Sequence, residues 1–260
     1  MRAFFAKMKV MRRAMFLVCI LLGIVVLAGP PTLPAAGQFP DSWPEPSGDP
    51  TGPDGIYGPT MPAPQERLRA GDASAGLLAR QVPQEGSGEF ETVPGEVEPV
   101  DPDADQALLV SIEVERDLQI DAERFAQFVL VTLNDERSWP GEMAVSFGRT
   151  DTDPDLRVLL ATPDTVDAEC APLATGGELS CAIEGSAVLN AVRWTEGART
   201  FTDPGAGLTD YRRYLLNHEV GHLLGHGHVS CPAEGEPAPV MVQQSISLDG
   251  CEPNGWVVTD

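Results

Sequence analysis

All four histidines of the 260-residue chain fall within one stretch of 11 residues, and two of them have the spacing of helical metal ligands. The stretch begins at His218 and has the sequence HEVGHLLGHGH. Residues four apart lie on the same face of a helix, so His218 and His222 can bind one ion between them. Glu219 is rotated by about 100° from His218, too far for a third ligand but close enough to reach a bound water.

A glycine after the second histidine predicts how a third ligand is brought back. Gly225 can adopt the left-handed turn that ends a helix without steric cost, and the turn returns His228 towards the other two histidines. Three neutral imidazole nitrogens leave the fourth position of a tetrahedral ion open, which distinguishes a catalytic zinc site from a structural one. We therefore expect Zn²⁺ as the cofactor, with His218, His222 and His228 as its ligands. His226 does not fit this spacing, and we expect it to support a ligand or to face solvent.

The stretch matches the long zinc signature HExxHxxGxxH, and in this respect the chain resembles the metzincin metallopeptidases. The long pattern is far more specific than HExxH, which recurs by accident. Metzincins also have a tight turn with a methionine beneath the zinc, and the resemblance places Met241 in that turn, with a packing role. No tyrosine follows Met241, so the tyrosine ligand of some metzincins is missing, and the 19 residues after it are too few for the long C-terminal helix of many members.

The stretch from Tyr211 to Cys251 also looks like an exported, mostly actinobacterial family whose function is unassigned. Members share NHEVGH, GHGH, a following CP, APVM and QQ, and all of these occur here from Asn217 onward. The likeness extends back to about Leu108.

The expected site and the metzincin resemblance together imply a zinc-dependent endopeptidase whose substrate is a protein or peptide. We expect the enzyme to be a monomer. Zinc lowers the pKa of a bound water towards 7 and stabilises the developing oxyanion. Glu219 would be the general base that takes the proton of the water and passes it to the leaving amine. Two alternatives stay open: a zinc-stabilised extracellular binding module without protease activity, and a zinc amidase that acts on cell-wall material. Glu219 disfavours the binding module, because zinc binding needs only the histidines.

The elements that must position these residues are predicted from the hydrophobic pattern of residues 106–260. We expect strands at 107–115, 143–147 and 156–161, a hairpin of 179–183 with 187–194, and helices from Asp121 to about Asn134 and from Thr209 or Asp210 to Leu224. This order predicts an α/β (α+β) domain with a mixed sheet, an N-terminal helix and an active-site helix. The resemblance makes it a small metzincin-like zincin domain.

Four cysteines in the same part of the chain predict two disulfide bonds, since an even number in an exported domain favours pairing. They allow three pairings. We favour Cys170–Cys181 and Cys231–Cys251, because each encloses one local loop. The second would tie the loop that carries the methionine to the chain just past the third histidine.

The N-terminal end has the pattern of a targeting segment. An apolar run from Ala14 to Ala28 follows five basic residues, which are Arg2, Lys7, Lys9, Arg12 and Arg13. Residues 1–28 are therefore predicted to be a signal peptide or an N-terminal membrane anchor, which places the rest of the chain outside the cell. Whether this segment is cleaved stays open. The apolar run is long for a signal peptide but short for a membrane-spanning helix, which needs about 20 residues.

Residues 29–105 contain 15 of the 24 prolines and 11 of the 26 glycines, a density typical of low-complexity chain. We expect a disordered acidic stalk there and the folded domain at 106–260. The alternative that this stalk is an inhibitory pro-segment stays open. It contains no cysteine, so it cannot inhibit by binding the zinc through a thiolate.

The formal net charge of −22 disfavours two classes of partner. An acidic surface repels phosphate backbones and acidic lipids, so we expect no nucleic acid and no membrane contact except through the N-terminal segment.

Asp151, Asp153 and Asp155 alternate like calcium ligands, but the glycine of an EF-hand loop is missing and a surface turn is favoured. Buried packing is favoured over a place in a cleft for Trp139, Trp194 and Trp256.

Overall fold

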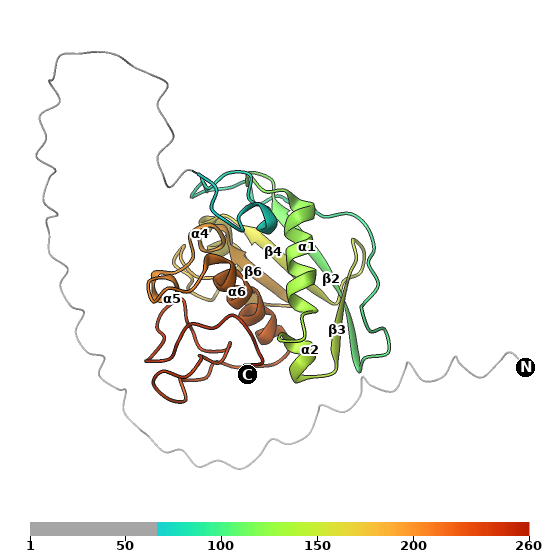
Figure 1. Cartoon of the computed structure of the whole chain (residues 1–260). Helices are drawn as coiled ribbons and strands as arrows, with labels where there is room; N and C mark the ends of the chain where they lie inside the picture. Colours follow the sequence, from blue (N-terminus) through green and yellow to red (C-terminus); the bar gives the residue numbers. More distant parts are fainter. Residues whose placement is uncertain (1–66, 260) are drawn as a thin grey trace, which may run out of the picture. The chain divides into compact units, whose positions relative to one another are not determined.

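A mixed sheet of six strands lies at the centre of the structure, a computed structural model in which residues 67–259 are described (Figure 1). The strand order is β1-β2-β4-β6-β5, and β3 pairs with the first half of β2. Strands β2, β3, β4 and β6 are parallel, whereas β1 and β5 are antiparallel to their neighbours. The strands are β1 Phe90–Thr92, β2 Gln106–Glu115, β3 Val145–Arg149, β4 Leu156–Ala161, β5 Cys181–Ile183 and β6 Ser186–Asn190. The predicted mixed α/β fold class is confirmed.

Helices cover both faces of this sheet. Alternate strand residues point to opposite sides, so apolar side chains of one strand can pack against helices on either face. Val158 and Leu160 of β4 pack in the core cluster that contains α1 and α6, whereas Leu159 packs with Val166 of α3. Helices α1 and α6 therefore share one face. The helices are the 3₁₀-helix η2 Ala73–Ala75, α1 Ala122–Leu133, α2 Trp139–Glu142, α3 Pro163–Glu169, α4 Ala191–Glu196, α5 Arg199–Thr202 and α6 Leu208–Leu223.

Most predicted elements are confirmed, with shifts of a few residues at their ends. The strands predicted at 107–115 and 156–161 are β2 and β4, and the two predicted helices are α1 and α6. The strand predicted at 143–147 begins later, as β3. The strand predicted at 187–194 is wrong beyond Asn190, whose side chain accepts hydrogen bonds from the backbone N–H groups of Val192 and Arg193 and so begins α4.

The predicted stalk is wrong from residue 67 onward, because residues 67–105 belong to the folded domain. Strand β1 pairs with β2, Leu77 forms a bridge with Ile120, and Ala75 and Val93 are buried. The domain therefore begins well before residue 106. A high content of proline and glycine is found not only in disordered chain but also in irregular chain that packs on a domain through a few apolar side chains. The predicted signal or anchor at 1–28, and residues 29–66 of the predicted stalk, lie outside the described residues.

Both predicted disulfide bonds are present. Cys170 is bonded to Cys181 and Cys231 to Cys251. Disulfide bonds persist in oxidising compartments, which fits an extracellular location. Among the helices of residues 67–259, none has the length and apolar character needed to cross a membrane.

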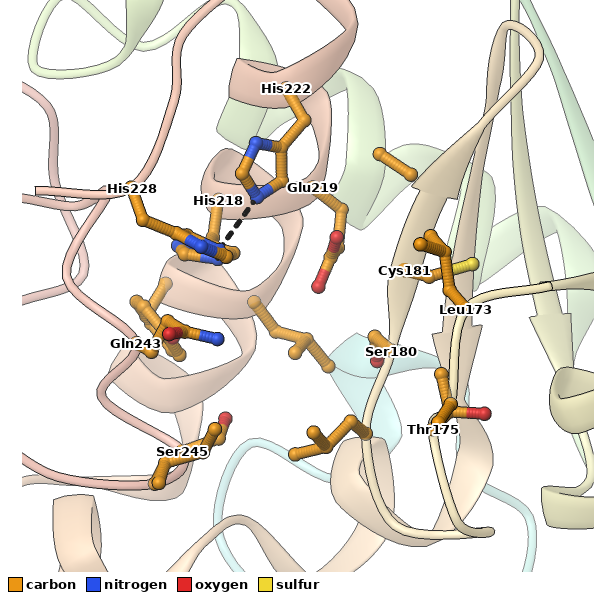
Figure 2. A pocket seen from close by; sticks show the side chains of 16 residues that line it. Leu173, Thr175, Ser180, Cys181, His218, Glu219, His222, His228, Gln243 and Ser245 are labelled. Atoms are coloured by element: carbon orange, nitrogen blue, oxygen red, sulfur yellow. Dashed lines mark hydrogen bonds between the residues drawn. The ribbon is translucent and has the colours of Figure 1, made fainter. Parts of the chain in front are cut away.

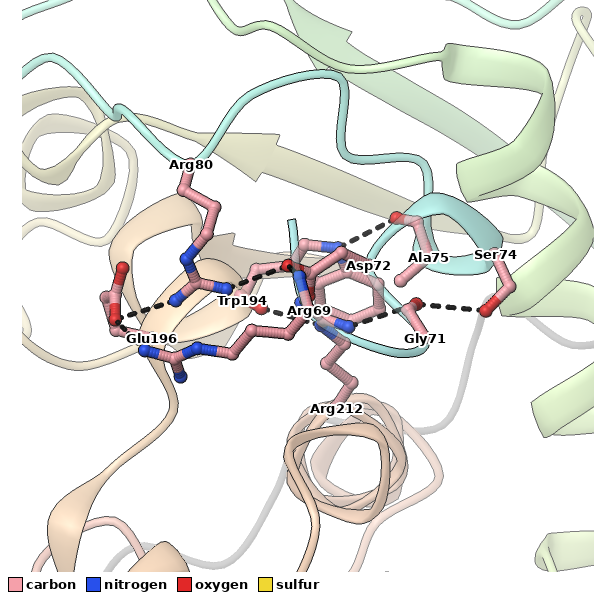
Figure 3. Close-up of polar contacts among 9 residues, drawn as sticks. All are labelled: Arg69, Gly71, Asp72, Ser74, Ala75, Arg80, Trp194, Glu196 and Arg212. Carbon is pink, nitrogen blue, oxygen red and sulfur yellow. Dashed lines mark hydrogen bonds and ion pairs between the residues drawn. The ribbon is translucent and has the colours of Figure 1, made fainter. Parts of the chain in front are cut away.

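A buried ion-pair network fastens the N-terminal segment of the domain to α6 (Figure 3). Asp72 accepts hydrogen bonds from Nη2 of Arg212 at 2.6 Å and from Nη1 of Arg80 at 2.9 Å, and none of the three side chains is more than 1 % exposed. Nε of Arg212 also donates to the carbonyl of Trp194 at 2.7 Å. Burial alone would raise the pKa of Asp72, but the hydrogen bonds from the Arg69 backbone, Arg212 and Arg80 outweigh it and lower this pKa.

We expect Asp72→Asn to lower the free energy of unfolding by about 3–5 kcal/mol, because it leaves the buried guanidinium group of Arg212 without its counter-charge, whereas Arg80 keeps its ion pair with Glu196. Urea unfolding at pH 7 measures the effect. Because the folded-state pKa of Asp72 is lowered, its contribution is complete above the unfolded value of about 3.9 and is lost as the pH falls through the folded value. The difference between wild type and variant should therefore shrink in acid.

Asp203→Asn is the matched control, since the pair of Asp203 with Arg199 is exposed and is worth at most about 1 kcal/mol. Equal losses in the two variants would contradict a special role for the buried network.

Candidate metal centre

Three histidines from α6 and the loop after it converge beside Glu219 (Figure 2). Their candidate ligand nitrogens all lie within 4.8 Å of one another. Nε2 of His228 is 3.3 Å from Nε2 of His218 and 3.0 Å from Nε2 of His222. Two nitrogens bound to one tetrahedral zinc at about 2.0–2.1 Å are about 3.3–3.4 Å apart. Two of the three separations are close to this value and all three lie within 4.8 Å, so the cluster can hold one ion of this kind. The structure thus brings together the three histidines expected as ligands from the sequence.

The turn at Gly225 brings the third histidine back, as its sequence position predicts. Gly225 has φ +96°, in the left-handed region that favours glycine. Its N–H donates to the carbonyl of His222 at 3.0 Å, and the N–H of His226 donates to the carbonyl of Gly221 at 2.9 Å. These two bonds close the end of α6 and direct the following residues towards His228.

Two backbone carbonyls fix the tautomer of the helical histidines. Nδ1 of His218 lies 2.8 Å from the carbonyl oxygen of Val240, and Nδ1 of His222 lies 2.8 Å from that of His226. A carbonyl only accepts, so each Nδ1 carries the proton and each Nε2 presents its lone pair to the cluster. This is the form that a metal-binding histidine needs. The sequence did not indicate Val240 as a partner, because its contact comes from a loop distant in the chain.

Burial shifts the ionisation of the site in two directions. It lowers the pKa of His218 to about 4 and also lowers the pKa of His228, so both imidazoles are neutral near pH 7, as metal ligands must be. Burial raises the pKa of Glu219 to about 8. A cation held by the three histidines would favour the ionised carboxylate.

The middle of the histidine motif is packed tightly from two sides. A Cβ atom at Gly221 would lie 2.4 Å from Cζ2 of Trp139 and 2.6 Å from the sulfur of Met241. Trp139 and Met241 are both buried. Met241 therefore lies against the turn of α6 between His218 and His222, which agrees with the packing role implied for it.

The other candidates from the sequence lie outside the group of possible metal ligands in the described chain. His226 stacks on Trp139 instead, with ring centroids 4.4 Å apart. Asp151 accepts a hydrogen bond from the N–H of Gly95, and Asp155 accepts one from the N–H of Leu109, so both carboxylates bind backbone from distant parts of the chain.

The tryptophans are also accounted for. Trp139 and Trp194 are buried as predicted, whereas Trp256 is half-buried beneath the guanidinium groups of Arg137 and Arg213 and lines a second pocket, so the prediction is wrong for it. No tryptophan is among the described residues that line the cleft at the metal centre.

A cleft of about 370 Å³ opens at the histidines and Glu219 (Figure 2). Gln243 and Ser245 lie on the side of the histidine cluster, whereas Leu173, Thr175 and Ser180 face them from the other side. That second wall is strand β5 and the loop closed by the Cys170–Cys181 disulfide. These lining residues were not predicted from the sequence, because they become neighbours only through the fold.

The fold and site define the chain as a mixed α/β domain with a three-histidine cluster in a cleft. It belongs to the family described as "Protein of unknown function (DUF3152)", whose model matches residues 78–255. The match begins within the segment predicted to be a stalk, in agreement with the earlier start of the domain. No curated protein and no solved structure matches the chain.

We expect Gly221→Ala to weaken zinc binding and to destabilise the metal-free protein by about 1–3 kcal/mol, the usual cost of overpacking a core. The sign is diagnostic, because alanine in a helix is otherwise favoured over glycine by about 0.5–1 kcal/mol. Competition with a chromophoric chelator measures the affinity, and urea unfolding measures the stability.

Gly227→Ala is the control from the same motif, since a Cβ there meets no atom within 4 Å. Zinc affinity unchanged by Gly221→Ala would show that the packing around this residue is not needed for the site.

Proposed function

We propose that this protein is a zinc-dependent endopeptidase of metzincin type, with His218, His222 and His228 as zinc ligands and Glu219 as general base. The observation that carries the proposal is the close approach of Nε2 of His228 to the Nε2 atoms of His218 and His222, at distances suited to one ion, beside a buried carboxyl group in an open cleft. A structural zinc site would be closed by a fourth protein ligand. The described residues supply three such ligands here.

The residues of this chain divide the work of hydrolysis. Bound zinc would supply Lewis-acid chemistry, which lowers the pKa of a water towards 7 and polarises a carbonyl group. Glu219 accepts the proton of the attacking water and donates it to the leaving amine. Its side chain is 5 % exposed, so the environment that raises its pKa also favours its holding the proton between the two steps.

The shape of the cleft supports an extended peptide as substrate. Strand β5 ends the strand order of the sheet, so one of its edges pairs with no other strand among the described residues and can accept an extended chain, and Ala182 of β5 lines the cleft. The opposite wall and the loop add the aliphatic side chains of Leu173, Leu179 and Ile246. Among the described lining residues, those that can carry a charge near pH 7 are the three histidines and Glu219, which favours uncharged side chains in the substrate.

The two disulfide bonds support work outside the cytoplasm. We propose that the protein is secreted, or held at the outer face of the cell membrane by residues 1–28, and acts there as a monomer.

The decisive experiment incubates the zinc-loaded full chain with a peptide library and identifies the cuts by mass spectrometry. We expect Glu219→Gln to retain zinc and to lose about 10²–10⁴-fold in kcat, because it removes the base and leaves the ligands. Glu91→Gln, an exposed glutamate on β1, is the matched control and should cleave like wild type.

Cuts that persist in Glu219→Gln would contradict the assigned role of the carboxylate. Folded, zinc-bound wild type that makes no cut would instead favour a binding module or a zinc amidase that acts on cell-wall material.

The two disulfide bonds should affect different steps. Cys170–Cys181 closes the loop that forms one wall of the cleft, so replacing both cysteines by serine should raise KM with a smaller change in kcat. Cys231–Cys251 encloses Val240 and Met241, so its removal should weaken zinc binding. Circular dichroism confirms folding of each variant, since the loss of a disulfide often costs about 2–5 kcal/mol. The same profile in both variants would show that the loops are not independent.

A further inference from the structure

The two helical ligands of the candidate metal centre differ in how firmly the fold holds them. His218 is 5 % exposed, and its Nδ1 contacts the carbonyl of Val240, which lies inside the loop closed by Cys231–Cys251. His222 is only half-buried in the last turn of α6, and its Nδ1 contacts the carbonyl of His226. The direction in which His222 presents Nε2 therefore depends on where the His226 carbonyl lies.

The backbone around His226 has little steric restraint. Gly225 and Gly227 flank it, both are exposed, and a Cβ atom at either would meet no heavy atom within 4 Å. Glycine allows the widest range of backbone conformations, so this stretch is intrinsically mobile unless other contacts hold it. One such contact is the hydrogen bond from the N–H of His226 to the carbonyl of Gly221. The side chain of His226 makes another.

The imidazole of His226 lies on a tryptophan that is buried and closely packed. The ring centroids of His226 and Trp139 are 4.4 Å apart and the ring planes are inclined by 35°. Trp139 is 2 % exposed, and its Nε1 donates to the carbonyl of Asn217 at 3.0 Å. The edge of its indole also fills the space beside Gly221. A flat ring stacked on this fixed surface restrains the backbone of the residue that carries it.

We propose that His226 is a positioning residue of the metal centre: its stack on Trp139 holds the His226 carbonyl against Nδ1 of His222, and so aims Nε2 of His222 at the ion. His226 acts through its ring face and its backbone, and it is not a ligand. The inference rests on the zinc site of the proposed function but does not require peptidase activity.

The test is a zinc titration of the full chain against a chromophoric chelator, with Co²⁺ as a spectroscopic probe of ligand geometry. We expect His226→Ala to weaken zinc binding by about 10–100-fold, the usual effect of losing a group that orients a ligand, and to alter the Co²⁺ d–d bands. His226→Phe keeps a flat ring on Trp139 and should bind zinc nearly as wild type does. Val229→Ala, a truncation at an exposed position of the same loop, is the matched control.

Unfolding of the metal-free proteins should be the same in wild type and His226→Ala, which separates a local effect on the site from a loss of stability. Zinc affinity unchanged in His226→Ala would overturn the proposal. A His226→Phe variant as weak as His226→Ala would also overturn it, because an imidazole nitrogen and not the stack would then be required. Peptide cleavage is measured on the same samples, so a wild type that binds zinc without cutting contradicts the proposed function while the affinities decide the role of His226.

Discussion

The burial of Arg212 within the helix that carries two of the candidate metal ligands sets the constraint on which the rest of the structure depends. A guanidinium group with no exposed surface is costly unless its charge and its N–H groups find partners. Asp72 supplies the charge and the Trp194 carbonyl accepts from Nε, so the segment before β1 and the end of α4 are both joined to α6. Loss of the first contact would leave a buried guanidinium group without its counter-charge, and loss of the second would leave a buried N–H without an acceptor. The first half of α6 is fixed in this way, and its second half can then present His218 and His222 at a defined place beside the sheet.

The second half of α6 is fixed by packing and by carbonyl groups from loops. Trp139 and Met241 close on Gly221 from two sides, which leaves room for no side chain at that position. The helix supplies the spacing of the two histidines, but the carbonyls of Val240 and His226 supply their orientation. Spacing is therefore a local property of the sequence, whereas orientation depends on residues brought in by the fold.

This division explains how far the sequence could predict the structure. An apolar run marks strand β4, and the Asp121 cap followed by apolar residues on one helix face marks α1. The set of candidate metal ligands follows from helical geometry and one glycine. The start of the domain was not predictable from composition, because prolines and glycines outnumber the few apolar residues, such as Leu77, that attach this segment to the core. Trp139 was expected to be buried, and it is, but its contact with His226 joins positions that no local pattern relates.

Asn217 shows why such a site can be built without regular structure after the helix. In the described chain, residues 225–259 contain no helix or strand, yet Gln244 is completely buried. The side chain of Gln244 donates to the carbonyl of Asn254 at 2.8 Å and accepts from its N–H at 2.9 Å. These two bonds hold the irregular segments together where no strands pair. Asn217 accepts from Ser138 with its Oδ1 and donates from Nδ2 to the carbonyl of Gly255. One amide beside the first histidine thus connects the segment that carries Trp139 to the C-terminal segment. Because these bonds are buried, the segment that carries Trp139 and the C-terminal segment are held to the same point of α6, one residue before the first histidine of the candidate metal centre.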